Sequence, residues 1–337
     1  PIAKILHIPL ITDVEKNYAL SSRFYPQIQV EFMPDLERQL GALAERFDTL
    51  FECKYWPIHL KPLFRQLYKK EMRLVFCPHG QSDKGYGAPL LAPYAWQDVV
   101  LLYGDLLQEM LKELGIWPSI SSYAVVGNYR LWFYQKHQLF YDRCFEKEIP
   151  LNKKKRTLLY APTWRDADAA SSFFQYGKKV IAELPSDWNL LFKPHPLIEQ
   201  RDPAHFYSIR AALDQKPNAF LMSEFPALYP ILAQSDIYLG DASSVGYDFL
   251  FFQRPLYFFP TDRPGKLHAC GQVIDPEKNI YRQLDVFSSS QSKQRDLYQF
   301  AFGSSFCKNE MRKAIYKTLL KDCYTPSNSK TSFVVEA

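Results

Sequence analysis

The chain has 337 residues, of which 47% are hydrophobic and 23% charged, a composition typical of proteins with a packed core. Its formal net charge of +5 suits an anionic ligand or an acidic membrane surface, but is too small to indicate nucleic-acid binding. The six cysteines lack metal-ligand spacing, and no apolar run approaches the roughly 18 residues of a membrane span, so we expect a cytoplasmic protein with reduced thiols.

Apolar runs and helical periodicities alternate along the first half of the chain. Residues 2–8 are predicted as a first strand, 35–50 as an amphipathic helix and 130–147 as a long aromatic helix. Further strands are predicted at 51–53, 74–77, 98–102 and 123–126, and a further helix at 105–114. This alternation is typical of a parallel sheet covered by helices.

Residues 60–73 are predicted as one helix with two different faces. Apolar side chains occupy one face, and the cations Lys61, Arg65, Lys69 and Arg73 recur every four residues on another. Such a stripe is typical either of a solvated helix or of peripheral contact with an anionic membrane.

A charged break at residues 153–156 precedes a second series of strands and helices. We therefore predict a Rossmann-like acceptor domain over 1–152, a Rossmann-like nucleotide-donor domain over 153–296, and C-terminal helices with a tail over 297–337. Predicted strands are 157–160, 189–192, 219–222, 237–239 and 256–259, and predicted helices are 173–184, 203–213, 226–234 and 245–252. Residues 285–296 are predicted as a loop, 297–321 as helical and the tail after Tyr324 as disordered.

Polar motifs follow the predicted strands in both halves. Ligands of parallel α/β sheets bind at the carboxyl ends of the strands, so this alignment predicts a binding site. The motifs are His79-Gly80, residues 127–130, residues 162–165, residues 193–195 and residues 241–244.

The second half carries the candidate phosphate-binding groups. Ser243 and Ser244 begin a predicted helix, where they would either cap it or help to bind a phosphate. The cations Arg165, Lys193 and His195 follow neighbouring strands and would surround a pyrophosphate, although each alone could be a solvated surface charge.

The first half carries the candidate base. His79 follows a strand and precedes a glycine that permits close approach of a ligand, so it is either a general base or a histidine that caps a turn. Asp83 would orient His79 or act as the base itself. Asp166 and Asp168 match the bare D-x-D pattern of metal-dependent transferases, but we expect no metal or other cofactor. Walker A and G-x-G-x-x-G motifs are absent.

The motifs CPHGQSDKG, VVGNYR, LLYAPTWRD, LLFKPHP and SDIYLGDASSVGYDFLFFQRPLYFF, taken together, resemble the CDP-glycerol glycerophosphotransferases of teichoic-acid and cell-envelope biosynthesis. The resemblance implies a GT-B fold of two Rossmann-like domains facing across a cleft. It also implies transfer of glycerol phosphate from CDP-glycerol to an acceptor hydroxyl, which releases CMP. The implied acceptor is lipid-linked or polymeric, and the implied location is the cytoplasm or the inner face of the membrane.

The resemblance also implies roles for individual residues. His79 is implied to be the catalytic base and His195 to contact the donor pyrophosphate. The implied donor contacts are Thr163, Arg165, Lys193, Asp241, Ser243, Ser244 and Asp248. The implied acceptor or cleft residues are Gly80, Lys84 and Arg130.

Three positions depart from the family pattern. Ala242 stands where an aromatic residue is usual, Tyr129 stands in the proline position of a Gly-x-Pro-Arg motif, and the residues after Gly80 differ. Two alternatives therefore stay open: another GT-B enzyme, such as a nucleotide-sugar glycosyltransferase or epimerase, or a non-catalytic member that binds nucleotide or lipid.

Overall fold

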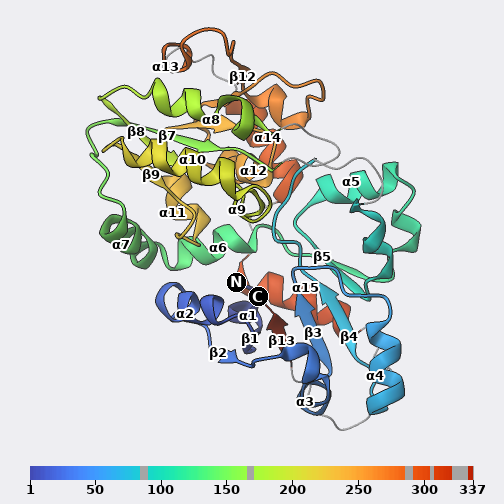
Figure 1. Ribbon diagram of the computed structural model, residues 1–337. Coiled ribbons are helices and arrows are strands. Elements are labelled where there is room, and N and C mark those ends of the chain that lie inside the picture. The colour runs from blue at the N-terminus through green and yellow to red at the C-terminus, as the bar shows by residue number, and fades with distance from the viewer. Residues whose placement is uncertain (84–89, 165–170, 285–290, 304–306, 321–332, 337) are drawn as a thin grey trace. The chain divides into compact units, whose positions relative to one another are not determined.

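The short apolar runs of the chain form two parallel sheets in the computed structural model, which describes residues 1–83, 90–164, 171–284, 291–303, 307–320 and 333–336 (Figure 1). The chain divides into two units. Unit 1 contains Pro1–His79, Gly85–Lys136 and Phe302–Ala337, and unit 2 contains Gly80–Lys84 and His137–Ala301.

The sheet of unit 1 has the strand order β2-β1-β13-β3-β4-β5-β6, with parallel pairing throughout. Its strands are β1 (Leu10–Thr12), β2 (Val30–Phe32), β3 (Thr49–Glu52), β4 (Arg73–Phe76), β5 (Val99–Leu102), β6 (Tyr123–Val125) and β13 (Phe333–Glu336). Its α-helices are α1 (Ile2–Leu6), α2 (Glu15–Phe24), α3 (Leu40–Arg46), α4 (Leu60–Tyr68), α5 (Asp105–Glu113), α6 (Tyr129–Lys136) and α15 (Lys308–Leu320).

The sheet of unit 2 has the order β12-β11-β10-β7-β8-β9, again parallel throughout. Its strands are β7 (Arg156–Ala161), β8 (Trp188–Phe192), β9 (Ala219–Leu221), β10 (Ile237–Gly240), β11 (Leu256–Phe258) and β12 (Gln272–Val273). Its α-helices are α7 (Gln138–Glu148), α8 (Ser172–Ala182), α9 (Pro196–Arg201), α10 (Pro203–Asp214), α11 (Leu228–Ala233), α12 (Ser244–Phe249), α13 (Ile280–Gln283) and α14 (Gln291–Phe302), the last residue of which is counted with unit 1.

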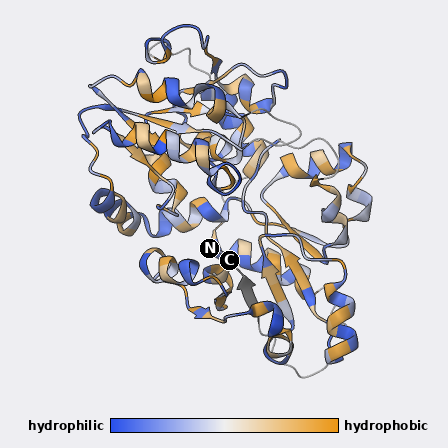
Figure 2. Ribbon diagram, viewed as in Figure 1, coloured by the Kyte–Doolittle hydropathy of each residue, from blue (hydrophilic) through white to orange (hydrophobic). Residues whose placement is uncertain are grey.

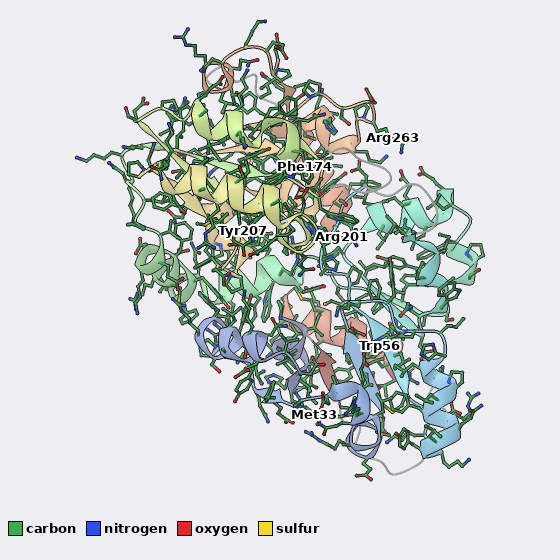
Figure 3. The ribbon with its side chains drawn as sticks, in the orientation of Figure 1. Met33, Trp56, Phe174, Arg201, Tyr207 and Arg263 are labelled. Carbon is green, nitrogen blue, oxygen red and sulfur yellow. The ribbon has the colours of Figure 1, made fainter. Side chains whose placement is uncertain are left out.

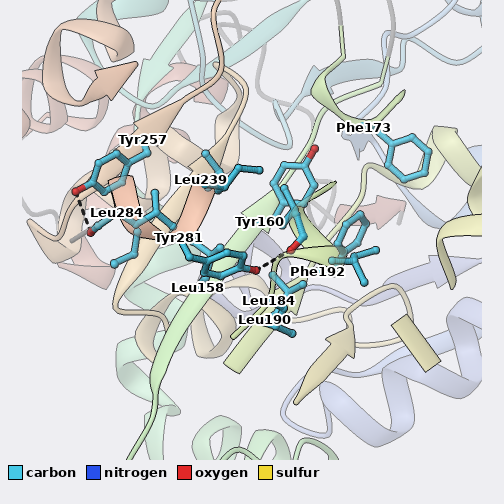
Figure 4. Packing of buried hydrophobic residues seen from close by; sticks show 14 of the residues in the cluster. Leu158, Tyr160, Phe173, Leu184, Leu190, Phe192, Leu239, Tyr257, Tyr281 and Leu284 are labelled. Carbon is cyan, nitrogen blue, oxygen red and sulfur yellow. Dashed lines mark hydrogen bonds between the residues drawn. The ribbon is translucent and has the colours of Figure 1, made fainter. Parts of the chain in front are cut away.

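The core of unit 2 lies between its sheet and helices α8 and α10. Alternate residues of β7 and β8, namely Leu158, Tyr160, Leu190 and Phe192, are completely buried there (Figure 4). The intervening residues Leu159 and Leu191 are also buried, as expected for parallel strands whose two faces are both covered. Figure 2 shows these strands, and β3, β4 and β5 of unit 1, as mainly hydrophobic. A rigid sheet results, and its carboxyl edge carries the polar motifs.

Several predicted elements differ from the observed ones. Residues 2–8 are not a strand: Ile2–Leu6 form α1, which His7 ends in the left-handed conformation (φ 60°). A short apolar run fits either structure, and here residues 2, 3, 5 and 6 bury one helical face. Within the predicted helix 35–50, helix α3 spans Leu40–Arg46 and the chain then enters strand β3. The predicted helix 130–147 is interrupted at His137, which separates α6 from α7.

The predicted cationic stripe over residues 60–73 does not form. Helix α4 ends at Tyr68, because Lys69 adopts a left-handed conformation (φ 53°), and Arg73 begins β4. On the helix, Lys61 pairs with Asp98 at 2.6 Å and Arg65 pairs with Glu71. The stripe therefore gives no support to membrane contact. Among the helices of the described residues, none has the length and apolar character needed to cross a membrane.

The C-terminal part returns to unit 1, contrary to the predicted division. Helix α15 packs against β5 and β6, and β13 lies between β1 and β3. The tail was predicted to be disordered, yet its apolar, β-branched run Phe333–Glu336 forms a strand inside the sheet. In addition, residues 291–296, predicted as part of a loop, begin α14. The other difference is at residue 137, where unit 2 begins before the predicted boundary because α7 packs against α11.

Candidate functional site

Three neighbouring strands of unit 2 bring together most of the predicted donor residues. Strand β7 lies between β10 and β8, and all three run parallel. The segments that follow these strands begin at Asp241, Pro162 and Lys193. Because parallel strands end at the same edge of a sheet, the three segments meet at the carboxyl edge.

Asp241 connects two of these segments. Its Oδ2 accepts a hydrogen bond from the Thr163 backbone N–H at 2.7 Å, and its Oδ1 accepts one from the Ser172 N–H at 3.2 Å. Ser172 is the first residue of α8, where a carboxylate is favourable. The predicted donor residues Asp241 and Thr163 are therefore joined directly by a hydrogen bond. Arg165 lies between Thr163 and Ser172 in the chain and outside the described residues.

Tyr238 and Gly240 shape the turn that carries the two serines. The Tyr238 hydroxyl donates to the Asp241 carbonyl oxygen at 2.8 Å and lies 3.4 Å from Ser243 Oγ. Burial raises the pKa of Tyr238, so this hydroxyl keeps its proton. A Cβ at residue 240 would lie 2.7 Å from the Ala161 carbonyl oxygen, so the turn requires glycine. The sequence offered no signal for the role of Tyr238, because it is one aromatic residue within an apolar strand.

The paired serines begin helix α12 as predicted. Ser243 occupies the N-cap position in an extended conformation (φ −151°, ψ 168°), but its side chain makes no capping hydrogen bond. Both serines are half-buried. Ser243 is therefore not a conventional cap, and its recorded hydroxyl contact is with Tyr238.

Asp248 lies in the interior of unit 2, near the end of α12. Its side chain is completely buried, and Oδ1 accepts a hydrogen bond from the Tyr229 hydroxyl at 2.7 Å. The observed partner of Asp248 is thus Tyr229, and its donor contact stays a prediction. The helical spacing places Asp248 one turn after Ser244, but that turn faces α11.

Lys193 is the half-buried cation of the second segment. Its backbone N–H continues the pairing with β7 by donating to the Tyr160 carbonyl at 2.8 Å, and its Nζ lies 3.5 Å from the Met222 carbonyl. Burial lowers the pKa of Lys193 to about 8. An anion bound beside this ammonium would raise the pKa again, since it favours the charged form.

His195 has a defined tautomer. Its Nδ1 accepts a hydrogen bond from the Leu197 backbone N–H at 3.2 Å, which assigns the ring proton to Nε2. Its backbone N–H donates to the Pro162 carbonyl, so this residue also joins two strand ends. The Trp164 ring lies 6.2 Å from the imidazole, and the guanidinium of Arg201, labelled in Figure 3, lies 4.5 Å from the Trp164 centroid. His195 is thus held as an N–H donor at this edge.

Residues 80–83 follow β4 in the chain but belong to unit 2. Gly80 packs directly on the second serine, and a Cβ at Gly80 would lie 2.7 Å from Ser244 Cβ. Asp83 is buried, and its Oδ2 accepts a hydrogen bond from the Lys266 backbone N–H at 2.5 Å. Asp83 was predicted to orient His79 or to act as base, but its observed contact anchors this segment. Lys84 lies outside the described residues.

His79 is exposed at the end of β4 in unit 1. Its Nδ1 lies 3.4 Å from the Cys53 carbonyl oxygen, which can only accept, so Nδ1 carries the proton and Nε2 holds the lone pair. Arg130, in the first turn of α6, is partly buried and places its guanidinium carbon 5.5 Å from the Tyr103 ring centroid. The two histidines therefore present different ring atoms: an N–H at Nε2 of His195 and a lone pair at Nε2 of His79.

Within the described part of the chain, no three His, Cys, Asp or Glu side chains converge into a group that could hold a metal ion. The predicted D-x-D residues, Asp166 and Asp168, lie outside the described residues.

The two parallel-sheet units, with polar segments at the strand ends, define a protein of the GT-B fold. Solved structures of that fold are similar over nearly the whole chain. A structure of the wall teichoic acid polymerase TagF soaked with CDPG has a TM-score of 0.61 at 15% identity and covers 93% of this chain and 89% of that chain. A putative UDP-N-acetylglucosamine 2-epimerase from Listeria monocytogenes has a TM-score of 0.56 at 15% identity and covers 96% and 99%.

Within this fold the chain belongs to the CDP-Glycerol:Poly(glycerophosphate) glycerophosphotransferase family, whose profile matches residues 132–312. A teichoic acid poly(glycerol phosphate) polymerase from Bacillus spizizenii is 32% identical over 120 residues, or 35% of this chain. The matched segment spans 29% of that polymerase, so the match covers less than a third of its length.

Proposed function

We propose that the chain transfers glycerol phosphate from CDP-glycerol to an acceptor hydroxyl and releases CMP. The observation that carries this proposal is the group at the carboxyl edge of unit 2: the Lys193 ammonium, the Nε2–H of His195 and the two serines. A cation, a ring N–H and hydroxyls together match the charge and acceptor oxygens of a pyrophosphate. Family membership and the name of the TagF structure soaked with CDPG support this choice of donor.

In the proposed reaction the acceptor oxygen attacks the phosphorus that bears glycerol. The bond from this phosphorus to the bridging oxygen breaks, and CMP leaves with that oxygen. The positive groups of unit 2 stabilise the charge that develops on the transferring group and on CMP. Arg165 is proposed as a further cation there, as the resemblance implies.

His79 is proposed to take the proton of the acceptor hydroxyl on Nε2. The tautomer set by Cys53 supports this role, because the lone pair of Nε2 is then the proton acceptor. Arg130 and Lys84 are proposed to contact the acceptor.

The donor assignment is tested by calorimetric titration of the protein with CDP-glycerol, CDP-ribitol and UDP-N-acetylglucosamine. We expect CDP-glycerol to bind most tightly, and the Lys193→Met variant to bind it at least tenfold more weakly, as expected when a charge-assisted contact is lost. The half-buried Lys216, after α10, also donates to a carbonyl oxygen, that of Ala182, so Lys216→Met is the matched control and should bind as wild type. Tightest binding of the UDP-sugar would instead support the glycosyltransferase or epimerase alternative, which the similar epimerase structure keeps open. Tight CDP-glycerol binding without turnover on any acceptor would support the non-catalytic alternative.

The acceptor is proposed to be lipid-linked or polymeric, which the name of the similar poly(glycerol phosphate) polymerase supports. Peripheral contact with the inner face of the membrane is a separate proposal. It does not rest on Lys61 and Arg65, because both are paired with acidic side chains. Co-sedimentation with anionic liposomes at low salt tests it, and a protein that stays in the supernatant would contradict it.

A further inference from the structure

Three strand ends of unit 1 meet at the carbonyl oxygen that precedes His79. Strands β4, β5 and β6 are neighbours in the sheet. Pro78 follows β4, Tyr103 directly follows β5, and Tyr129 begins α6 after β6. The two tyrosine side chains therefore reach Pro78 from the ends of the next two strands of the sheet, β5 and β6.

The contacts form a closed triangle of oxygen atoms. The Tyr129 hydroxyl lies 2.5 Å from the Pro78 carbonyl oxygen, the Tyr103 hydroxyl lies 2.7 Å from it, and the two hydroxyls are 2.9 Å apart. The rings are stacked, with centroids 4.9 Å apart and an interplanar angle of 15°. A carbonyl oxygen has two lone pairs, so it can accept from both hydroxyls.

The pair is held from several sides. Tyr103 is completely buried and Tyr129 nearly so. Burial raises the pKa of Tyr129 well above its ordinary value, so it stays a proton donor. The Phe302 ring packs edge-on against Tyr103 at 5.6 Å. Movement of either hydroxyl would therefore require the surrounding core to repack.

This carbonyl oxygen controls the backbone of His79. The Pro78 carbonyl and the His79 N and Cα atoms share one planar peptide group, so an oxygen fixed by two hydroxyls also fixes the direction in which the chain enters His79. Proline adds a fixed φ on the other side. The pairing of β4 with β5 has ended by this point, because its last registered pair is Phe76 with Val100.

We propose that Tyr103 and Tyr129 are positioning residues that hold His79 for proton transfer. The proposal rests on the proposed function, in which His79 is the base. Tyr129 stands where the related Gly-x-Pro-Arg motif has proline, which has no hydroxyl, so its part in the triangle belongs to this chain's own sequence. A general base must lie within hydrogen-bond reach of its proton, and a displacement of about 1 Å can lower a rate about a hundredfold.

The test uses Tyr103→Phe and Tyr129→Phe, which keep the rings and remove one hydroxyl each. The control is Tyr281→Phe, because Tyr281 is another buried tyrosine, whose hydroxyl donates to the Val180 carbonyl at 2.9 Å in the core of unit 2 (Figure 4). Rates are measured with CDP-glycerol and a synthetic lipid-linked acceptor ending in glycerol phosphate, after circular dichroism has verified the fold. We expect kcat to fall about tenfold in each site variant, with the KM for CDP-glycerol changed less than about twofold, and kcat to be unchanged in the control.

A double-mutant cycle separates positioning from general stability. His79→Asn should lower kcat by about 10²–10⁴, and adding Tyr129→Phe to it should cause no further loss, because the positioned group is gone. An unchanged kcat in both tyrosine variants beside a defective His79→Asn would overturn this proposal alone, as would a full further tenfold loss in the double variant. A His79→Asn enzyme with the wild-type rate would overturn the base assignment of the proposed function, and this proposal with it.

Discussion

Asp241 and Asp236 are two aspartates at opposite edges of the sheet of unit 2, and both accept hydrogen bonds from backbone N–H groups. At the carboxyl edge, Asp241 accepts hydrogen bonds from Thr163 and Ser172 and so holds the segments around the proposed donor site. At the amino edge, Asp236 Oδ2 accepts from the Thr157 backbone N–H at 2.8 Å. Both carboxylates satisfy backbone donors, but only one lies beside candidate ligand-binding groups.

Replacing Asp241 with asparagine should weaken both folding and donor binding. The amide would turn an N–H group toward backbone donors. We therefore expect the free energy of unfolding to fall by about 1–3 kcal/mol and CDP-glycerol to bind about tenfold more weakly. Asp236→Asn is the matched control: it should lower stability similarly and leave affinity unchanged. Denaturant unfolding and calorimetry measure the two effects, and equal affinity losses in both variants would contradict the assigned role of Asp241.

The pKa of Lys193, about 8, predicts a pH-dependent donor affinity. A bound pyrophosphate raises this pKa, so near and above pH 8 binding takes up a proton. Affinity is then full well below pH 8 and falls as the pH rises through 8 toward the pKa of the complex. We expect CDP-glycerol binding to weaken about eightfold from pH 7 to pH 9, at most tenfold per pH unit. Lys193→Arg, which stays charged throughout, should remove this dependence. An unchanged pH profile in that variant would show that another group is responsible.

At the scale of elements, the segment 80–83 is held by contacts within unit 2. Gly80 packs on Ser244, and Asp83 accepts from the Lys266 N–H. The segment is thus fixed at both of its ends. The close contact at Gly80 explains why a glycine follows His79 at this point in the chain.

Gly80→Ala should disturb the start of α12 without unfolding the protein. The added methyl group would lie 2.7 Å from Ser244 Cβ, so the segment must shift, and we expect kcat/KM to fall about tenfold. Gly41→Ala is the control, because in α3 its methyl group would meet only the Tyr68 ring, at 3.1 Å. Steady-state kinetics on both variants provide the test; a Gly80→Ala enzyme with wild-type kcat/KM would show that this contact is not needed.

For the molecule as a whole, the fold class and the strand-end motifs were predictable, because buried parallel strands are short apolar runs and their ends carry polar residues. A strand was predicted where a helix forms at residues 2–6, because a short apolar run fits either structure. Contacts between residues far apart in the chain left no signal in the local sequence. Examples are Tyr229 with Asp248, Asp83 with Lys266, and Tyr103 and Tyr129 with Pro78. The strand Phe333–Glu336 was missed because its partners lie nearly the whole chain away.

We propose that the transfer needs no metal ion, since the side chains of Lys193 and Arg165 supply the positive charge and the Nε2–H of His195 supplies a hydrogen bond. Addition of 5-fold excess EDTA over any added divalent ion, at about millimolar concentration, should then change CMP release less than about twofold. Restoration of a lost activity by Mg²⁺ or Mn²⁺ would contradict this expectation and would direct attention to Asp166 and Asp168.

The central claim is that the chain moves glycerol phosphate from CDP-glycerol to an acceptor hydroxyl with His79 as base. Its most direct test measures CMP release and product formation together, with CDP-glycerol or UDP-N-acetylglucosamine as donor, a lipid-linked acceptor ending in glycerol phosphate, and wild-type or His79→Asn protein. We predict one CMP released per glycerol phosphate added, a rate about 10²–10⁴ lower in the variant, and no turnover of the UDP-sugar. Turnover of the UDP-sugar with CDP-glycerol left intact would contradict the claim.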